Sequence, residues 1–381
     1  MSASGKVAAS AGGGDRTGLA DRLLRLRDRV LSDPSFLRIS GSTMLGRAIG
    51  RREAAALFDV AAGFVYAQVL SAVIRLDLLE TLREGPLAPG ELARRLDLPV
   101  RSMDRLLIAA EPLRLVARRG GGRWGLGYRG AAVLGNPGLV AMVRHHDILY
   151  RELADPVALL RRGAGTEMGA FWPYARGAGE VSEAEVADYS RLMSASQHFI
   201  ADEVMAAYPF GRHRHVLDVG GGEGTFALAL AARHPALRVT VLDLPAVAER
   251  ARMRFARSGH GDRLAALDGD FIRTALPQGA DAVTLVRVVH DHDDEVALAL
   301  LRRVAEVLPP EGRLVLAEPM AGAPAAPGIA SYFAFYLLAM GSGRPRTAGE
   351  LTALLHSAGF RTVRRRPERN PTVTRVLVAR R

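Results

Sequence analysis

A glycine-rich segment that follows an apolar run constrains the fold of this chain most strongly. The run Val216–Val219 leads into Gly220, Gly222 and Gly224, and a helical pattern of apolar residues begins at Phe226. This order predicts a β-strand, a tight turn and an α-helix. Glycines let the backbone turn sharply and approach a ligand closely, and free N–H groups at a helix N-terminus attract a carboxylate or phosphate. The segment therefore predicts an anion-binding loop in an α/β fold.

The spacing of the glycines separates two classes of cofactor. The dinucleotide fingerprint is G-x-G-x-x-G, whereas this loop has glycines at alternate positions and Asp218 two residues before the first of them. A carboxylate there repels a pyrophosphate, but it favours the ammonium and sulfonium groups of S-adenosylmethionine, whose own carboxylate suits the helix start. Asp243 ends the next apolar run and can bind two ribose hydroxyls. The pattern therefore favours S-adenosylmethionine as the cofactor.

Length and composition limit the number of domains, the possible site chemistry and the possible partners. The chain has 381 residues, 49% of them hydrophobic, which suffices for two domains and a large buried core. It has no cysteine, and this excludes disulfides, zinc–thiolate sites and thiol nucleophiles. The net charge of +11 suggests nucleic acid or an anionic membrane as a partner, but arginine supplies all of the basic residues except Lys6. We therefore expect a modest affinity for anionic surfaces and no nucleic-acid partner.

The N-terminal region carries two helical patterns. Residues Met1–Gly18 form a Gly/Ala/Ser tract without the apolar core of a signal peptide, which predicts a disordered tail and a cytoplasmic protein. Leu19–Asp33 is a basic amphipathic pattern, followed by a linker to residue 50, and it suits either a membrane surface or a groove of the same protein or its partner. Ala54–Ile74 is long enough to span a membrane, but Asp59 and Gln68 favour a helix in a dimer interface.

Residues 51–190 are predicted to form a mainly helical domain with a winged helix. Helical patterns near Leu78, at Glu91–Leu96 and at Ser102–Ala110 precede two short strands around Gly120–Gly122. A winged helix is a known DNA-binding module, so a DNA-binding regulator is one alternative. The third helix offers mainly apolar side chains beside its arginines. Dimerisation is therefore the preferred role of this domain.

Residues 191–381 are predicted to form the cofactor-binding domain. Strand-like runs alternate with helical ones, and seven strands of a doubly wound α/β sheet fit the pattern. Ligands of open α/β sheets bind beyond the carboxyl ends of the strands. Asp243, Asp270 and Glu318 all occur at such ends. We therefore expect these acidic residues at one edge of the sheet.

The catalytic candidate lies where the fourth apolar run, Ala282–Val289, stops. His290 follows this run, and an imidazole titrates near neutrality, so it can accept a hydroxyl proton as a methyl group is transferred. The acidic and histidine residues at 291–294 are also potential metal ligands, but neighbours at a strand end point in opposed directions and no distant ligand completes a set. No metal is therefore expected. Asp293 or Asp294 also suits the N-cap of a following helix.

The chain resembles the class I S-adenosylmethionine-dependent O-methyltransferases of the plant phenolic and bacterial small-molecule type. The resemblance runs from about residue 55 and rests on the glycine loop, the winged-helix-like region, Gly269-Asp270-Phe271 and His290-Asp291. It implies a homodimer with a seven-stranded Rossmann-like domain, in which His290 is the general base and Glu318 supports it. The cofactor residues it implies are Asp218, Gly220, Gly222, Gly224, Asp243, Leu244, Asp270, Phe271 and Arg287, with Asp270 and Phe271 at the adenine.

Three positions depart from the pattern of that family. His292 stands where the family has tryptophan, Pro345 stands where it has a second supporting glutamate, and Val286 beside Arg287 replaces a lysine. Pro345 therefore removes one of the two carboxylates that support the histidine in that family. Methyl transfer itself depends mainly on positioning, so we expect it to be retained. An inactive scaffold that binds the cofactor is the alternative that Pro345 favours.

The segments expected to line the acceptor site are rich in apolar and aromatic residues. Ser331–Met340 is more apolar than its counterpart in phenol methylators, and it suits either a helix core or the wall of a site for a long, oily acceptor. The residues predicted to contact the acceptor are Phe171, Trp172, Met193, Asp291, Phe333, Tyr336 and Met340.

A narrower resemblance points in the same direction. Leu57–Leu70, Gly135–Gly138 with His145-His146, and Phe171–Ala175 are similar to the carotenoid 1-hydroxy O-methyltransferases of purple phototrophic bacteria. This resemblance implies methylation of a tertiary hydroxyl on an acyclic carotenoid such as demethylspheroidene or hydroxyneurosporene, and a place at the inner photosynthetic membrane. A polyketide or phenazine-type O-methyltransferase that acts on a flat aromatic phenol is the alternative enzyme.

Overall fold

The structure is a computed structural model that describes residues 16–33, 35, 44–163, 165–171, 197–323, 328–367, 369 and 374–381. Its contacts divide the chain into two compact units, Met1–Leu70 and Ser71–Arg381, which are described separately below. The predicted boundary between residues 190 and 191 lies outside the described residues, and the other predicted boundaries stay predictions.

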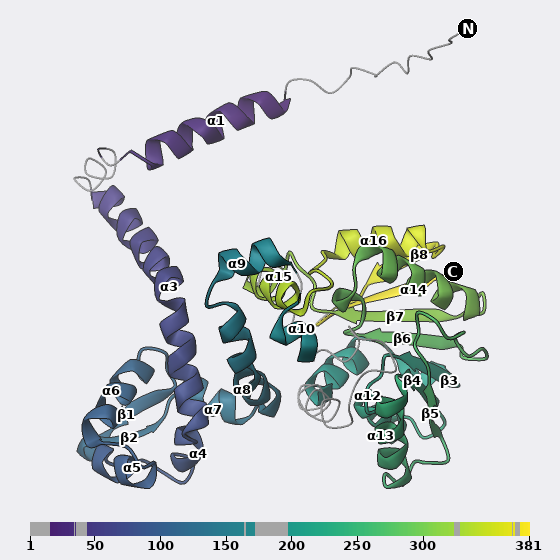
Figure 1. The fold of residues 1–381 in the computed structure, drawn as a ribbon, viewed down its shortest axis with the longest axis horizontal. Helices are drawn as coiled ribbons and strands as arrows, with labels where there is room; N and C mark the ends of the chain where they lie inside the picture. The colour runs from purple at the N-terminus through teal and green to yellow at the C-terminus, as the bar shows by residue number, and fades with distance from the viewer. Residues whose placement is uncertain are drawn as a thin grey trace. The chain divides into compact units, whose positions relative to one another are not determined.

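The described residues of the first unit include α1 (Arg16–Leu31) and most of α3 (Met44–Arg75), as drawn in Figure 1. The helix predicted over Leu19–Asp33 corresponds to α1, whose leucines at 23, 24, 26 and 31 are exposed. Much of the apolar surface of α3 is exposed as well, including Leu57, Phe58 and Phe64. By length and composition, residues Gly46–Arg75 suffice to cross a membrane, but the core helix of a soluble protein passes the same test.

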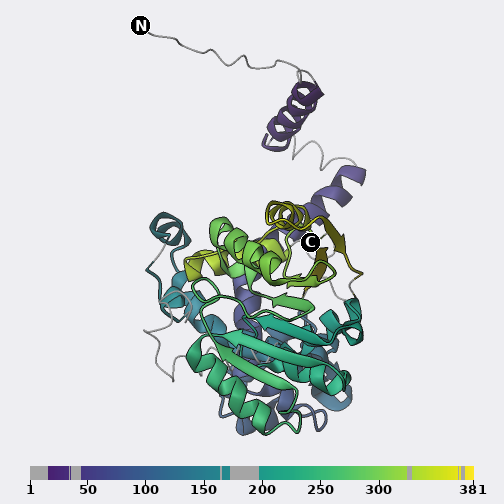
Figure 2. The same cartoon turned by 90° about the vertical axis from the view of Figure 1, so that its right-hand side faces the viewer.

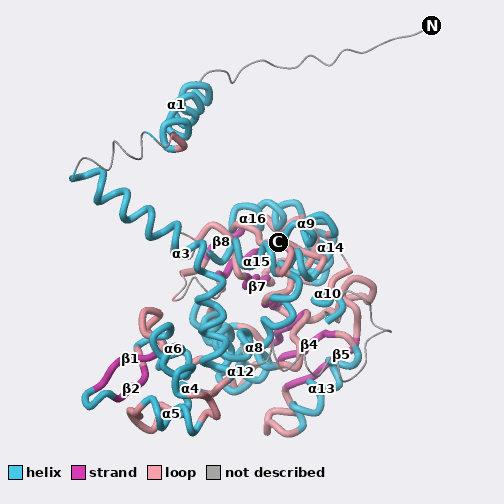
Figure 3. Tube along the Cα trace, turned by 60° about the vertical axis from the view of Figure 1, so that its left-hand side comes forward, coloured by secondary structure: helices cyan, strands magenta, loops and turns pink. Residues whose placement is uncertain are grey.

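The second unit begins with the predicted winged helix. Its elements are α4 (Leu78–Thr81), α5 (Pro89–Arg95), α6 (Val100–Ala110), β1 (Val116–Arg119), the 3-10 turn η1 (Gly120–Gly122), β2 (Arg123–Leu126) and α7 (Tyr128–Leu134). The two strands pair antiparallel, and the hairpin lies beside α6 in Figure 3. Helix α6 buries Met103, Leu107 and Ala110 at helical spacing, so its apolar face belongs to the domain core. Arg101 and Arg105 of the same helix are exposed.

Several helices lie between the winged helix and the sheet domain in the described residues. They include α8 (Pro137–Glu152), α9 (Pro156–Arg162) and α10 (Glu167–Phe171). Helices α8 and α9 begin with a capped proline turn, because Asn136 accepts a hydrogen bond from Leu139 N and Asp155 accepts one from Ala158 N. Residues 197–207 are helical and lead into the sheet domain through the 3-10 turn η3 (Phe210–Arg212).

The sheet domain contains the seven-stranded sheet that the sequence predicts, in the order β5-β4-β3-β6-β7-β9-β8. The first five strands of this order are parallel, and β9 runs antiparallel to both of its neighbours. The strands are β3 (His215–Val219), β4 (Arg238–Asp243), β5 (Leu264–Asp268), β6 (Ala282–Val286), β7 (Arg313–Glu318), β8 (Thr362–Arg365) and β9 (Arg375–Arg380). The remaining elements are α12 (Thr225–Arg233), α13 (Pro245–Ala256), η4 (Val289–Asp291), α14 (Asp294–Val307), α15 (Gly328–Met340) and α16 (Ala348–Ser357).

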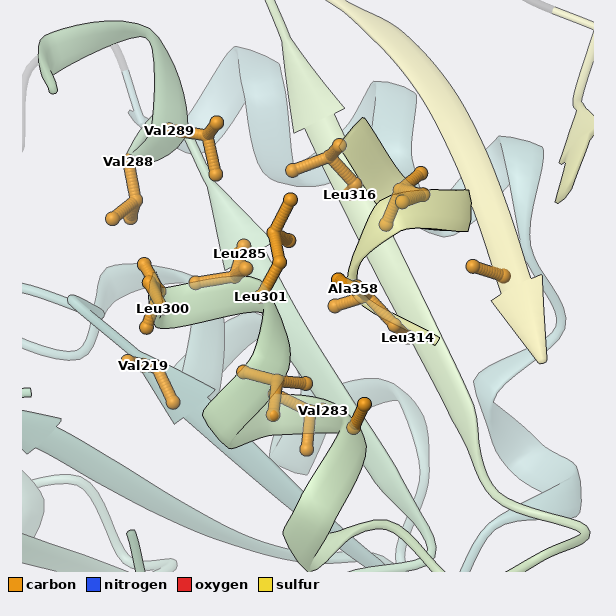
Figure 4. Close-up of a cluster of buried hydrophobic side chains, with 14 of the residues drawn as sticks. Val219, Val283, Leu285, Val288, Val289, Leu300, Leu301, Leu314, Leu316 and Ala358 are labelled. Carbon is orange, nitrogen blue, oxygen red and sulfur yellow. The ribbon is translucent and has the colours of Figure 1, made fainter. Parts of the chain in front are cut away.

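Helices cover both faces of this sheet, as Figures 1 and 2 show. One face packs against α14 and α16, and Figure 4 shows Leu300 and Leu301 of α14 beside Val283 and Leu285 of β6. The other face packs against α12, α13 and the helix at 197–207. Alternate strand residues point to opposite faces, so these strands are apolar on both sides. This doubly wound arrangement brings the carboxyl ends of β3, β4, β6 and β7 to one edge, where the site forms.

Candidate functional site

The three glycines predicted to form the loop after β3 all adopt left-handed backbone conformations. Their φ angles are 69° at Gly220, 61° at Gly222 and 75° at Gly224. A Cβ atom would lie 2.8 Å from Val288 at Gly220 and 2.3 Å from Phe255 at Gly224, so these two positions need glycine for packing as well. A Cβ at Gly222 would meet no atom within 4 Å. The loop therefore opens at Gly222, where a ligand can approach the backbone.

Asp243 fixes this loop to the neighbouring strand. Its Oδ2 accepts a hydrogen bond from Gly222 N at 2.8 Å, and its Oδ1 accepts one from Leu244 N at 2.8 Å. The side chain is buried at the carboxyl end of β4. Asp243 thus stands beside the open part of the glycine loop, as expected for a residue that holds the ribose hydroxyls. That role stays a prediction.

Asp218 lies beneath the loop rather than at its surface. It is 1% exposed, and its Oδ1 accepts a hydrogen bond from Thr284 Oγ1 at 2.6 Å. Within the described part of the chain, its Oδ2 has no hydrogen-bond partner. Burial raises the pKa of Asp218 to about 7, the Thr284 hydrogen bond opposes this shift, and the charge of Asp243 adds to it. Because Asp218 is buried, it would act on the cofactor cation from beneath the loop and not from its surface. This interaction stays a prediction.

The residues predicted at the adenine lie beyond β5. Asp270 is held in a turn, where its Oδ1 accepts a hydrogen bond from Ile272 N at 2.8 Å. Phe271 is buried, and its ring packs edge-on against His292 with the centroids 5.3 Å apart. Arg287 follows β6 with a φ of 59°, and its backbone N–H donates to Ala317 O at 2.8 Å. The cofactor contacts of these residues stay predictions.

His290 and Glu318 form the buried pair that the sequence predicts. His290 Nδ1 lies 2.6 Å from Glu318 Oε2, and both side chains are buried. Glu318 Oε1 accepts hydrogen bonds from Val288 N at 3.1 Å and Val289 N at 2.7 Å. Because the Glu318 carboxylate is an acceptor in all of these contacts, Nδ1 carries a proton, and Nε2 is the nitrogen at which the ring can gain or lose a proton. This is the arrangement that a general base requires.

A second carboxylate lies at the other ring nitrogen. His290 Nε2 is 3.1 Å from Asp291 Oδ1, and Asp291 is also buried. Burial alone lowers the pKa of His290, but the charges of Asp291 and Glu318 outweigh it and hold the pKa above its usual value. Burial raises the pKa of Asp291 to about 6. The charge of His290 opposes this shift, and the charge of Glu318 adds to it. Asp291 thus occupies the position where a second carboxylate can act on the imidazole, although Pro345 has replaced the glutamate of the family pattern.

The segment that carries His290 differs from the expected strand end. Strand β6 stops at Val286 instead of continuing to Val289, because Arg287 turns the backbone into the left-handed region. His290 then lies in the 3-10 turn η4. Asp293 is the N-cap residue of α14, but its side chain makes no capping hydrogen bond; its Oδ1 accepts a hydrogen bond from Gly343 N at 3.0 Å instead. Within the described residues, no group of three or more His, Asp or Glu side chains is placed to hold a metal ion.

Arg346 is a functional candidate that the sequence analysis did not single out. It is 2% exposed, and its guanidinium donates to Val289 O at 2.8 Å and to His292 O at 2.7 Å, the two carbonyls that bracket the catalytic turn. Its Nε donates to Asp294 Oδ1 at 2.8 Å. The backbone N–H of Arg344 also donates to His290 O at 3.0 Å. In the sequence, Arg346 directly follows Pro345, the position that departs from the family pattern, and this proximity was the available signal.

The expected acceptor-lining residues of α15 lie next to the base. The ring of Phe333 packs edge-on against His290 with centroids 5.6 Å apart. Tyr336 packs against Phe333 at 6.3 Å, while Met340 is buried in the apolar cluster with Leu149 and Leu159. Met340 therefore belongs to the helix core in the described residues. Trp172, Met193 and the side chain of Phe171 lie outside the described residues, and their predicted roles stay predictions.

Two histidines of α8 complete the aromatic cluster around α15. His146 Nε2 lies 2.9 Å from Tyr332 Oη, and His145 Nε2 lies 3.4 Å from Tyr336 Oη. Burial lowers the pKa of His145 to about 4, and the neighbouring His146 contributes to this shift. Burial also raises the pKa of Tyr332 and of Tyr336. The cluster is therefore neutral near physiological pH. The two histidines are part of the resemblance to the carotenoid O-methyltransferases, but their sequence context predicts no role for them.

The chain matches known proteins along most of its length. Residues 150–361 match the O-methyltransferase domain family, and residues 58–133 match the O-methyltransferase dimerisation domain. The chain belongs to the O-methyltransferase family. It is 42% identical to demethylspheroidene O-methyltransferase of Cereibacter sphaeroides over 94% of this chain and 95% of that protein. It is 43% identical to the enzyme of the same name from Rhodobacter capsulatus, over 87% and 84% of the two chains.

Solved structures of O-methyltransferases share this fold. CalO1, a methyltransferase of calicheamicin biosynthesis solved in its SAH-bound form, has a TM-score of 0.72 and 27% identity, and the match covers 86% of this chain and 98% of that one. Family membership confirms the prediction of an S-adenosylmethionine-dependent O-methyltransferase, and the dimerisation domain supports the predicted homodimer. The residues present fit this cofactor, since Gly222 leaves open space beside Asp243 at the sheet edge.

Proposed function

We propose that this O-methyltransferase methylates the tertiary 1-hydroxyl of an acyclic carotenoid of the demethylspheroidene or hydroxyneurosporene type, with His290 as the general base. The similarity to two demethylspheroidene O-methyltransferases over most of the chain supports this acceptor class. Helix α15 consists almost entirely of apolar and aromatic residues, and its Phe333 contacts His290. Both features are consistent with an oily acceptor. The observation that carries the catalytic part of the proposal is the buried His290–Glu318 pair, 2.6 Å apart.

Under this proposal each residue of the site has a separate task. S-adenosylmethionine, when bound, supplies an electrophilic methyl group on a sulfonium. The glycine loop and Asp243 would hold it at the sheet edge. Glu318 accepts a hydrogen bond from His290 Nδ1–H, so Nε2, which also contacts Asp291, is the nitrogen that would receive the proton of the acceptor hydroxyl. A tertiary alcohol is much less acidic than a phenol, so its reaction depends more strongly on this base.

Substitution of His290 tests the catalytic proposal. We expect His290→Gln and His290→Ala to lower kcat by about 10²–10⁴-fold, the usual contribution of a general base, while calorimetry shows unchanged S-adenosylmethionine binding. His356→Gln, at a histidine on α16 that bonds Phe360 O, is the matched control and should keep full activity. Unchanged turnover of both His290 variants would remove the residue from the mechanism.

A panel of acceptors tests the substrate class. The protein is incubated with labelled S-adenosylmethionine and either hydroxylated acyclic carotenoids or polycyclic phenols, and the products are identified by mass analysis. We expect methyl transfer to the carotenoid hydroxyls. Methylation of the phenols alone would show that the enzyme belongs to the alternative class that acts on flat aromatic phenols. Sequence-specific DNA binding without methyl transfer would favour a DNA-binding regulator.

We further propose that the enzyme is a cytoplasmic homodimer that contacts the inner membrane through α1. The dimerisation domain supports the first part. For the second part, the exposed leucines of α1 alternate with arginines, as in helices that lie in a membrane interface. Such contact would bring the active site to the phase in which an oily acceptor is dissolved.

A further inference from the structure

A large apolar cleft lies at the junction of the winged helix and α8. Its volume is about 730 Å³, and its walls come from the last turn of α3 and from α4, α7 and α8. The side chains that give it its character include Val73, Leu79, Val133, Val140, Ala141 and Ile148. Protein interiors are close-packed, and clefts of this size and character are typical of sites for small apolar molecules.

Two ion pairs join the two sides of this cleft, and three of their side chains, Asp77, Arg144 and Asp147, line it. Arg75 Nη1 lies 3.2 Å from Asp147 Oδ2, and Arg144 Nη2 lies 3.1 Å from Asp77 Oδ1. Each pair links the α3–α4 side to α8. Exposed pairs of this kind contribute little to stability, so these two pairs oppose the entry of a ligand only weakly.

The cleft is connected to the proposed base by a row of aromatic rings. His145 forms part of the cleft wall and contacts Tyr336 of α15, with ring centroids 6.3 Å apart. Tyr336 contacts Phe333, and Phe333 contacts His290. The same side chain of α8 therefore borders both the cleft and the aromatic cluster at the active site.

The two polar contacts in this cluster differ in strength. His146 and Tyr332 are 2.9 Å apart, within the range of a good hydrogen bond, whereas His145 and Tyr336 are 3.4 Å apart. The weaker contact lies between the cleft and the base. It is the contact that would open to let an extended chain through, and a neutral imidazole leaves no charge against an apolar chain.

We propose that this cleft is a subsite for the distal hydrocarbon chain of the acceptor, whose hydroxyl end lies at His290, and that the His145–Tyr336 contact is the passage between them. The inference rests on the proposed function. A compact phenol needs only the space next to the base, while a long polyene needs a second apolar volume in line with it. A second copy of the chain is the competing occupant, because much of the cleft wall lies within the dimerisation domain.

Filling the cleft tests this proposal. Ala141→Trp and the smaller change Val140→Phe put bulk into the cleft from α8, and Val157→Trp puts it on an exposed position of α9 that does not line the cleft. For each variant, kcat/KM is measured with a full-length hydroxylated carotenoid and with a ten-carbon isoprenoid that bears the same tertiary hydroxyl. S-adenosylmethionine affinity and size-exclusion chromatography report folding and oligomeric state.

We expect the two cleft variants to lose about tenfold or more in kcat/KM for the long acceptor, mainly through KM, while the short acceptor reacts as with the wild type. Val157→Trp should change neither value. Equal loss for both acceptors, no loss for either, or conversion of the dimer to a monomer would each overturn the proposal. If the wild type methylates neither acceptor, it is the proposed function that fails.

Discussion

The two ring nitrogens of His290 contact two different carboxylates, and these carboxylates have different effects on its action as a base. Glu318 is held by two backbone N–H groups, so it fixes the orientation of the ring and its tautomer. Asp291 lies at Nε2, the nitrogen that must receive the acceptor proton. Its charge stabilises the imidazolium and so strengthens the base, but it also competes with the hydroxyl for the same nitrogen. The acceptor must therefore take its place beside Asp291 for the proton to move.

Removal of the Asp291 charge tests this balance. In Asp291→Asn the imidazolium loses a stabilising negative charge, so the pKa of His290 should fall. Activity requires neutral His290, so the acidic limb of the kcat/KM profile should move to lower pH by about one unit or more. Asp268→Asn, at an exposed carboxylate that pairs with Arg252, is the control and should leave the profile unchanged. A limb that stays in place in Asp291→Asn would show that this charge does not act on the base.

The elements of the site were predictable from sequence to different degrees. The strands β3, β4 and β7 are predictable because each is a continuous apolar run. The loop is predictable because its left-handed positions 220, 222 and 224 are all glycine. The turn after β6 was missed, because the left-handed residue there is Arg287, and an arginine gives no such signal. The partners of His290 across the fold, such as Phe333, depend on packing between segments that no local pattern specifies.

Arg346 links two elements, and its substitution tests whether the catalytic turn needs bracing. A lysine has one compact ammonium and cannot reach both carbonyls and Asp294 at once. Since a displacement of about 1 Å at a reacting group can cost about 10²-fold in rate, we expect a loss of that order in kcat for Arg346→Lys, with S-adenosylmethionine affinity preserved. Added guanidinium should restore part of the activity of Arg346→Ala.

The neighbouring arginine provides the control for this experiment. Arg344 is partly exposed and pairs with Asp294 and Glu350. Arg344→Lys should therefore retain most of the activity. Equal losses in both lysine variants, or no guanidinium rescue, would mean that Arg346 contributes only to general stability.

At the scale of the whole molecule, the site combines residues that are far apart in sequence. His146 and Tyr332 are in contact although 186 positions separate them. This contact brings α8, which follows the winged helix, to the sheet domain and its base. No local sequence pattern pairs these two segments, because the contact depends on tertiary packing. The described helices of the first unit, Met1–Leu70, have a different property, because they expose apolar side chains such as Leu23, Leu57 and Phe64.

The basic helix α1 is expected to bind anionic membranes. Leu23 and Leu26 are 60% and 56% exposed, and arginines surround them. We expect the full-length protein to float with anionic liposomes in a density gradient, less so at high salt because salt screens the arginine charges. Leu23→Glu/Leu26→Glu and a chain that starts at residue 45 should both float much less. The charge-retaining control Leu23→Ile/Leu26→Ile should float as the wild type does. Equal flotation of all four proteins would exclude α1 as the membrane contact and leave the exposed apolar surface of α3 as the remaining candidate.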